Sequence, residues 1–378
     1  MNDFQIFAKP VGSSCNLSCT YCYYLDKEPN DYGFGILRMS DELLENYIIN
    51  HIEATNGDIV MFSWHGGEPL LAGIPFYRKA LEFQNRFLPR GKRVLNGLQT
   101  NGTLLDKEWC QFLSGNGFFV GLTLDGPQKF HDQFRINNGG IGTFNQVLKG
   151  FHMLRQYGII PEILCVVNSS NVEHPLLVYS FLRDLGPEYL TFLPLVNKDN
   201  EKESHNAVTA DSVSSEAFGD FLIAIYEEWM YRDIGKIKIQ VIEEALRTAF
   251  NQDHTLCIFK KECGGVPIVT HSGDVYSCDH YVDGDHFMGN LMNVPLQEML
   301  NSDIQTDFGR KKRTMLPAIC KSCPVLSMCN GECPKNRFIT TPDGEFGLNY
   351  LCPGYRKFFT HLQPFVEEVR KNWLDQMR

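Results

Sequence analysis

The chain has 378 residues, enough for one large α/β domain and a smaller one, and its 43% of hydrophobic residues can fill a core. The 35 Lys and Arg residues against 45 Asp and Glu residues give a formal net charge of −10, which argues against nucleic-acid binding by phosphate neutralisation. No apolar stretch is long enough to span a membrane, and the first residues lack a signal core, so we expect a cytoplasmic protein without membrane contact.

Short β-rich runs alternate with helical stretches as far as about residue 195. The expected strands are 4–8, 59–64, 94–99, 118–124, 162–167 and 189–193. The expected helices are 40–54, 75–88, 106–115, 143–157 and 173–184, with Ser40, Asp106 and Thr143 as N-caps. This alternation predicts parallel strands joined by crossover helices, and six such units are too few to close an eight-stranded barrel. We therefore expect an α/β fold, a partial (β/α)6 barrel open along one side.

Glycine and polar residues follow several of these strands. Examples are His65-Gly66-Gly67-Glu68, Thr100-Asn101-Gly102 and Asp125-Gly126. Ligands of parallel α/β folds bind outside the carboxyl ends of the strands. The sequence therefore predicts a binding site along this rim.

The composition of the sequence changes after the predicted barrel. Residues 197–212 are polar and predict a surface loop, followed by helices near 213–231 and 238–250. From Cys257 to Cys352 the chain is rich in Cys, Gly and Pro, as expected of a segment folded around metal. The expected divisions are a barrel over 1–196, a connecting segment over 197–256, a cysteine-rich domain over 257–355 and a helix over 356–378. The basic run Arg310 to Arg313 predicts a solvated face near a helix end.

Thirteen cysteines are too many for a core alone, and a reducing compartment disfavours disulfides, so metal binding is the expected role of most. Cys110 and Cys165 lie in apolar patterns and are expected to be small buried hydrophobes. Cys15, Cys19 and Cys22 offer three thiolates where an iron-sulfur cube needs four, which leaves one iron open to a ligand. A zinc site is the structural alternative. The histidines expected to be surface or loop residues are His254, His271, His280 and His286.

Tyr21, between the second and third of these cysteines, completes a CxxxCxYC pattern that resembles the radical S-adenosylmethionine superfamily. The run Gly66 to Pro69, GGEP, is similar to the glycine-rich segment of that family. The resemblance implies a 4Fe-4S cluster on the three cysteines and S-adenosyl-L-methionine at its open iron. The residues implied as cofactor contacts are Tyr21, Gly67, Thr123, Arg135 and Val196.

The remaining eight cysteines resemble the SPASM extension of that superfamily, which binds two auxiliary 4Fe-4S clusters. The resemblance assigns Cys257, Cys263, Cys278 and Cys333 to the first and Cys320, Cys323, Cys329 and Cys352 to the second. The protein would then hold three 4Fe-4S clusters, or about twelve irons. Zinc remains the alternative metal for this segment, since thiolates suit both.

Within the SPASM proteins the chain most resembles the anaerobic sulfatase-maturating enzymes, through runs such as KPVGSSCNLSCTYCYY, VGLTLDGPQKFHDQFR and GDVYSCDHYV. The resemblance implies oxidation of a cysteine or serine in a CxPxR or SxPxR motif of a sulfatase to Cα-formylglycine. Asp279 would be the general base. An external one-electron reductant such as flavodoxin or ferredoxin would supply the electron, and the auxiliary clusters would carry one away.

Two other functions fit parts of the pattern. The first is another SPASM maturase acting on a ribosomal peptide, which often carries an N-terminal recognition domain. Cys15 comes too soon for such a domain, which favours the sulfatase reading. The second is a non-enzymatic electron carrier or a zinc-stabilised binding module, which an anaerobic iron and sulfide count would separate from the enzyme.

Overall fold

A computed structural model describes residues 4–24, 37–199 and 207–376. Residues 200–206, in the middle of the predicted polar loop, lie outside this range. The chain divides into two compact units, which are described separately. The first comprises Met1–Thr123, Asp132–Pro161 and Gly264–Gly309, and the second Leu124–His131, Glu162–Cys263 and Arg310–Arg378.

The first unit is built on a sheet in the order β10-β9-β8-β1-β2-β3-β4. Its strands are β1 (Ile6–Ala8), β2 (Ile59–Trp64), β3 (Arg93–Thr100), β4 (Phe119–Thr123), β8 (Ile268–Val269), β9 (Asp274–Tyr276) and β10 (Phe287–Asn290). The pairings from β1 to β4 and of β1 with β8 are parallel, whereas β8, β9 and β10 pair antiparallel. The four parallel strands predicted here are confirmed. The three short strands were not predicted.

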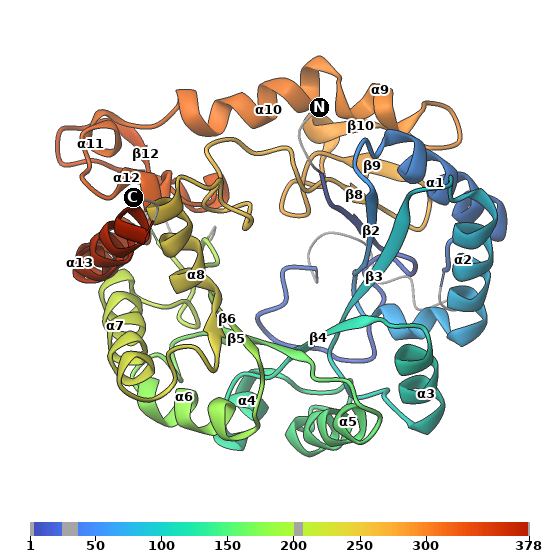
Figure 1. Ribbon diagram of the computed structural model, residues 1–378, viewed down its shortest axis with the longest axis horizontal. Helices are drawn as coiled ribbons and strands as arrows, with labels where there is room; N and C mark the ends of the chain where they lie inside the picture. Colours follow the sequence, from blue (N-terminus) through green and yellow to red (C-terminus); the bar gives the residue numbers. More distant parts are fainter. Residues whose placement is uncertain (1–3, 25–36, 200–206, 377–378) are drawn as a thin grey trace. The chain divides into compact units, whose positions relative to one another are not determined.

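Helices of the first unit follow the parallel strands. They are α1 (Asp41–Ala54), α2 (Ile74–Phe87), α3 (Lys107–Gly115), α5 (Phe144–Gln156) and α9 (Leu296–Leu300). Figure 1 shows α1, α2 and α3 beside one another along the outer side of β2 and β3. The apolar faces of α1 and α2 meet there, with Trp64 of β2 edge-on to Tyr47 of α1 and to Tyr77 of α2. Aromatic packing of this kind buries a large area on one face of the sheet.

The predicted N-caps have two outcomes. Ser40 accepts a hydrogen bond from the Leu43 N–H and Asp106 accepts one from the Trp109 N–H, as predicted. Thr143 occupies the N-cap position of α5, as predicted, but its side chain makes no capping bond, because its hydroxyl donates to the Arg135 carbonyl. Asp132 accepts from the Phe144 N–H in its place. Asp132 lies at the end of α4 (Gln128–Phe134), a short helix that was not predicted.

The second unit holds the parallel strands β5 (Glu162–Val167), β6 (Tyr189–Pro194) and β7 (Lys238–Ile239). Its longer helices are α6 (Pro175–Asp184), α7 (Ser215–Arg232), α8 (Gln240–Arg247) and α13 (Cys352–Gln376), and α10 (Asp303–Thr314) ends in it. Figure 1 shows α7 and α13 side by side. Gly219 and Gly354 permit this approach, because a Cβ on Gly354 would lie 1.9 Å from the Ser215 carbonyl oxygen.

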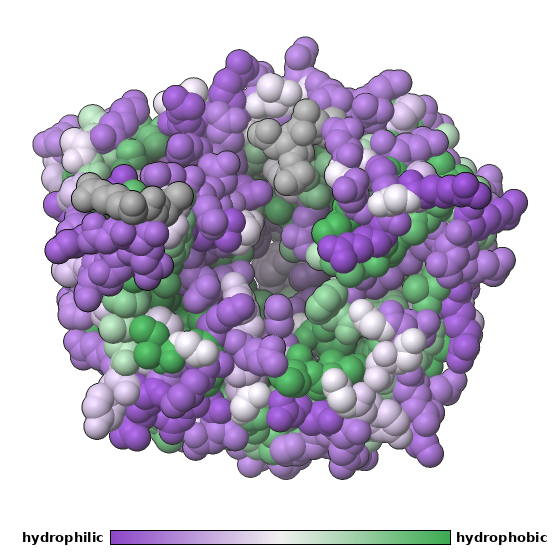
Figure 2. All heavy atoms as spheres, viewed as in Figure 1, coloured by the Kyte–Doolittle hydropathy of each residue, from purple (hydrophilic) through white to green (hydrophobic). Residues whose placement is uncertain are grey.

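The cysteine-rich segment includes β8, β9, β10, α9 and α10, described above. Its further short elements are α11 (Ala318–Lys321), α12 (Leu326–Cys329), β11 (Ile339–Thr340) and β12 (Phe346–Leu348). Hydrophilic residues predominate on the face of the molecule in Figure 2. Among the described helices, none combines the length and the apolarity that crossing a lipid bilayer requires.

Candidate functional site

The three cysteines of the first motif lie in the loop after β1. The Cys22 N–H donates to the Cys19 carbonyl at 3.0 Å, and the Leu17 N–H approaches Cys15 Sγ at 3.4 Å. The tip of the GGEP segment is fastened to this loop, since the Gly67 N–H donates to the Gly12 carbonyl at 3.0 Å. A Cβ on Gly67 would lie 2.2 Å from the carbonyl oxygen of Ser14, so only glycine fits. The structure thus brings the two sequence motifs together.

Glu68 ties the end of β2 to the end of β3. Its buried carboxyl accepts hydrogen bonds from the Leu70 and Asn101 N–H groups and the Thr100 hydroxyl, at 2.8–3.0 Å. Burial raises the pKa of this carboxyl to about 7, although the hydrogen bonds oppose the rise. The Asn101 amide in turn approaches Cys15 Sγ at 3.7 Å. The predicted rim of polar residues therefore adjoins the cysteine loop.

The surroundings of the thiols in this loop favour the binding of a metal cluster. Burial and, to a smaller extent, the Glu68 carboxyl raise the pKa of Cys15 to about 12. Burial also raises the pKa of Cys22. Thiolates, the form that binds metal, are thus costly here unless a positive charge stabilises them, and metal ions supply such a charge. In a 4Fe-4S cluster each thiolate would bind a different iron, so the three thiols need not surround a single ion. Among the described residues, no three metal-binding side chains gather around one ion.

Four of the five residues expected to contact the cofactor lie in the first unit. Arg135 is buried and donates to the Tyr21 hydroxyl at 2.9 Å. Thr123, at the end of β4, accepts from the Gln99 amide at 3.1 Å. Val196 lies in the second unit, where its carbonyl accepts from Lys335 at 3.2 Å. Tyr21, Arg135 and Gly67 thus flank or touch the cysteine loop.

Asp279 occupies a buried polar cluster of the first unit. Its Oδ1 pairs with the ammonium of Lys9, and its Oδ2 accepts hydrogen bonds from the hydroxyls of Tyr23 and Tyr24, both at 2.5 Å. Lys9 is 3% exposed and Asp279 7%. The Lys9 ammonium also lies 4.2 Å from the centre of the Tyr24 ring. The carboxylate is therefore held in one place by residues at both ends of the cysteine loop.

The surroundings of Asp279 keep it ionised. Burial alone would raise the pKa of its carboxyl, but the Lys9 charge and the tyrosine hydroxyls hold that pKa well below its usual range. Nearby, His65 stacks on Phe7 at 4.3 Å, and burial lowers the pKa of its imidazole to about 4. His65 is therefore neutral near pH 7, and Asp279 is an available proton acceptor of low basicity.

The four cysteines assigned to the second auxiliary cluster line one cavity in the second unit. Its lining includes Cys320, Cys323, Cys329 and Cys352 together with Ile319, Val325 and Leu326. The pKa of Cys329 is raised to about 12, by burial first and then by the Glu332 carboxyl and neighbouring thiolates. The pKa of Cys352 is raised to about 11, by burial and then by the thiolates of Cys320 and Cys323. An apolar cavity with four mutually repelling thiols fits a cluster that supplies the compensating positive charge.

Three of the four cysteines assigned to the first auxiliary cluster, Cys257, Cys263 and Cys333, also lie in the second unit. Burial raises the pKa of Cys257 to about 11, and it raises that of Cys263. Cys278 belongs to the first unit, where it precedes Asp279 and its backbone forms an isolated antiparallel β-bridge with Tyr281.

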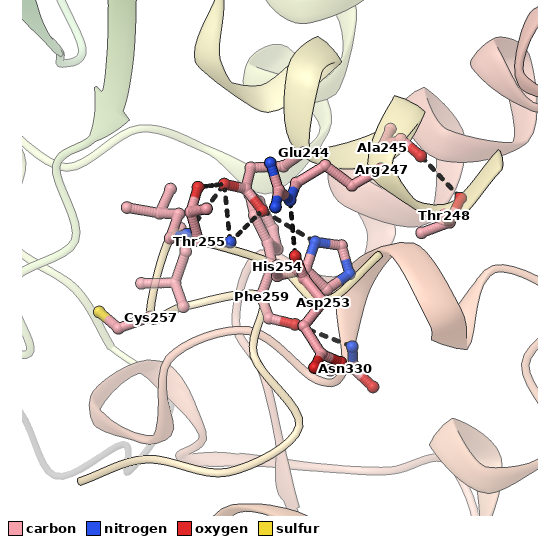
Figure 3. A network of polar contacts seen from close by, with 12 residues as sticks. Glu244, Ala245, Arg247, Thr248, Asp253, His254, Thr255, Cys257, Phe259 and Asn330 are labelled. Carbon is pink, nitrogen blue, oxygen red and sulfur yellow. Dashed lines mark hydrogen bonds and ion pairs between the residues drawn. The ribbon is translucent and has the colours of Figure 1, made fainter. Parts of the chain in front are cut away.

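A polar network fixes the loop that carries Cys257 (Figure 3). The carboxylate of Glu244 accepts hydrogen bonds from the N–H groups of Thr255 and Leu256, the Thr255 hydroxyl and His254 Nδ1. His254 Nε2 lies 2.8 Å from the Ser327 carbonyl of α12. Both ring nitrogens of His254 therefore face oxygen atoms that can accept a hydrogen bond. Glu244 and His254 thereby link the Cys257 loop to the helix that ends at Cys329.

The sequence missed several of these residues. Lys9, Tyr23 and Tyr24 were not singled out, although all three flank the cysteine motif in the KPVGSSCNLSCTYCYY run. His254 was expected to be a surface or loop residue; it lies in a loop but is buried. The basic run is exposed as predicted at Arg310, Lys311 and Arg313, but the prediction is wrong for Lys312, which is buried. Cys110 and Cys165 are buried, as predicted.

Comparisons with known proteins agree with these features. Residues 10–173 match the Radical SAM superfamily, and residues 263–324 match an iron-sulfur cluster-binding domain, SPASM. A serine-type anaerobic sulfatase-maturating enzyme of Bacteroides thetaiotaomicron is 42% identical over 98% of this chain and 92% of its own. A cysteine-type enzyme of Clostridium perfringens is 32% identical over 98% of this chain and all of its own.

A solved structure, native anSMEcpe with bound AdoMet and Cp18Cys peptide, is similar with a TM-score of 0.87 and 29% identity. The match covers 98% of this chain and all of that one. The expected α/β fold with a cysteine-rich SPASM domain is thereby confirmed.

Proposed function

Because the chain belongs to the anaerobic sulfatase-maturating enzymes of the radical S-adenosylmethionine superfamily, we propose that it oxidises a serine or cysteine of a sulfatase to Cα-formylglycine. The relationship over 98% of the chain carries the proposal. Radical SAM proteins use S-adenosylmethionine and a 4Fe-4S cluster, and the SPASM domain binds additional iron-sulfur clusters. The protein is a radical SAM enzyme.

We assign the first cluster to Cys15, Cys19 and Cys22. The auxiliary clusters are assigned to Cys257, Cys263, Cys278 and Cys333, and to Cys320, Cys323, Cys329 and Cys352. When bound, the reduced first cluster and S-adenosylmethionine supply a radical that removes a hydrogen atom from Cβ of the target residue. Tyr21, Gly67, Thr123, Arg135 and Val196 are the proposed contacts of S-adenosylmethionine.

The protein's own part in the chemistry is to hold that cofactor beside the cysteine loop and to receive a proton. The planar guanidinium of Arg135 suits a carboxylate, and its bond to Tyr21 fixes its orientation. Asp279 accepts the proton of the target hydroxyl or thiol, and the electron that remains after loss of the hydrogen atom and this proton would pass to the auxiliary clusters. A cysteine target would give a thioaldehyde, which water would hydrolyse to the aldehyde with release of sulfide. The low basicity of Asp279 means that proton transfer occurs as the target loses its electron and becomes more acidic, and the Lys9 and tyrosine contacts keep the carboxylate ready and oriented.

We propose serine, in preference to cysteine, as the target residue. Two relatives of the serine type are 42% and 34% identical to this chain, against 32% for the cysteine-type enzyme of Clostridium perfringens. We further propose that the recognised motif is SxPxR or CxPxR in a sulfatase polypeptide. A flavodoxin or ferredoxin would be the external reductant, and we propose the cytoplasm as the compartment of the reaction.

The test is an anaerobic incubation of the reconstituted protein with reductant, S-adenosylmethionine and peptides carrying SxPxR or CxPxR. We expect mass spectrometry to show the aldehyde in the serine peptide. Formation of 5′-deoxyadenosine without oxidation of either peptide would refute the substrate while retaining the radical chemistry. Oxidation of the cysteine peptide alone would reverse the proposed target preference.

A further inference from the structure

Lys312 departs from its neighbours in the basic run at the end of α10. It is 1% exposed, whereas Lys311 and Arg313 on either side are exposed. Its ammonium donates to the carbonyl oxygens of Cys257 at 2.9 Å and Ile258 at 2.7 Å. Carbonyl oxygens carry no full negative charge, so these two contacts solvate the ammonium without neutralising it.

Two kinds of negative charge can balance Lys312: the thiolates of nearby cysteines and the buried carboxylate of Glu332, whose pKa burial raises and the Lys312 charge lowers. Burial lowers the pKa of the Lys312 ammonium, while the thiolate forms of Cys263, Cys257 and Cys333 raise it, in that order of influence. These three cysteines are the ones in the second unit that are assigned to the first auxiliary cluster. A buried lysine without a counter-ion is costly, and thiolates held by a metal cluster remove that cost.

Arg337 fixes the backbone of Lys312 through a hydrogen bond to its carbonyl oxygen. Its Nη1 donates to the Lys312 carbonyl at 2.5 Å, and its Nε and Nη2 donate to the carbonyls of Gly331 at 2.8 Å and Asn330 at 3.0 Å. The end of α10 is thereby joined to the segment that leads into Cys333. The Lys312 ammonium is fixed in place by contacts at both its backbone and its side chain.

We propose that Lys312 is a positioning residue whose fixed positive charge raises the reduction potential of the cluster on Cys257, Cys263 and Cys333. The proposal rests on the ligand assignment made under the proposed function. A cluster bound by thiolates is an anion and gains a further negative charge on reduction. A cation buried beside it stabilises the reduced state more than the oxidised state, because the interior screens charge weakly. Residues around the ligands commonly tune a metal site in this way.

The test compares three variants by anaerobic redox titration monitored by electron paramagnetic resonance. Lys312→Gln keeps hydrogen-bond donors for the two carbonyls but removes the charge, and Lys312→Arg keeps the charge. Lys311→Gln removes an adjacent exposed charge and is the matched control. We expect the potential of one auxiliary cluster to fall in Lys312→Gln, to stay near the wild-type value in Lys312→Arg, and to stay unchanged in Lys311→Gln.

An unchanged potential in Lys312→Gln with full iron content would overturn the proposal. If Lys312→Gln loses the cluster, Lys312→Arg decides: retention of iron in the arginine variant supports a role for the charge, and loss in both shows a packing role only. The ligand assignment is tested separately by Cys263→Ala, which should lower the iron content by about four per chain. Iron that stays at the wild-type level in Cys263→Ala refutes the assignment, whatever happens at Lys312.

Discussion

Replacement of Asp279 by Asn should separate oxidation of the peptide from cleavage of S-adenosylmethionine. The change keeps the size of the side chain but removes the proton acceptor. Loss of a general base typically lowers a rate by about 10²–10⁴-fold, and we expect peptide oxidation to fall within that range. Formation of 5′-deoxyadenosine should fall much less, because the proposed cofactor contacts are other residues.

The same substitution strands a buried charge. The Lys9 ammonium is 3% exposed and would lose its carboxylate partner. Breaking a buried pair by removing one partner costs about 3–5 kcal/mol, which is a large part of the stability of a typical domain. Lower activity of Asp279→Asn could therefore reflect a damaged fold. The double variant Lys9→Met with Asp279→Asn removes the stranded charge and should recover much of the stability without recovering peptide oxidation.

The assay measures aldehyde by mass spectrometry and 5′-deoxyadenosine by chromatography in the same anaerobic reaction, for preparations of equal iron content. Thermal unfolding of each variant supplies the stability comparison. Equal losses of both products in Asp279→Asn would refute the role as base. Recovery of peptide oxidation in the double variant would show that the charge imbalance, and not the missing acceptor, caused the loss.

Three further substitutions test the framework around the site. Gly67→Ala places a Cβ 2.2 Å from the Ser14 carbonyl oxygen, so we expect loss of the first cluster, measured as about four irons fewer per chain. The control is Gly57→Ala, whose added Cβ would have no atom closer than 4.0 Å and which should keep the wild-type iron content. Glu244→Gln leaves several donors of the Cys257 loop without a carboxylate; unfolding in denaturant should show a loss of about 3–5 kcal/mol. Burial lowers the pKa of His51 from 6.5 to about 3, so the unfolded chain takes up its proton first as the pH falls. The contribution of His51 should therefore lower the free energy of unfolding by about 1.4 kcal/mol for each pH unit between 6.5 and about 3. Comparison of the free energies of unfolding of His51→Gln and the wild type at pH 7.5 and 5.5 measures this contribution.

The sequence predicted the elements whose signals are local. All six barrel strands were located because each is a short β-rich run between turn residues, and the long helices because their apolar spacing persists over several turns. The short strands β8, β9 and β10 carry too few residues for such a pattern. They join the sheet through β8, whose partner β1 lies more than 250 residues away in the chain, while β9 and β10 pair with their neighbours in sequence. Thr143 occupies the predicted N-cap position, but its hydroxyl donates to the Arg135 carbonyl and not to the helix, a partner that the local sequence does not indicate.

The candidate site divides in the same way. Cysteine spacing indicated the ligands, since a thiol has few uses in such numbers. The partners of Asp279 could not be inferred, because Tyr23 and Tyr24 are 256 and 255 residues away and their hydroxyls carry no distinctive local pattern. Lys312 was misjudged for a related reason. Lysine is almost never fully buried unless it is paired, and its carbonyl partners lie 54 and 55 residues away.

The thiols of the first motif and those near Lys312 have opposite electrostatic surroundings. After burial, the strongest influence on the pKa of Cys15 is the Glu68 carboxyl, which raises it. For Cys263, the next influences after burial are Lys312 and Arg337, and both lower it. Whatever disfavours a thiolate also disfavours an extra electron on the cluster that the thiolate binds, because both add negative charge. If the clusters are bound as we propose, these charges would make the first cluster harder to reduce and the first auxiliary cluster easier. An electron released by the target residue would then be more stable on the auxiliary side, which would favour completion of the oxidation over its reversal.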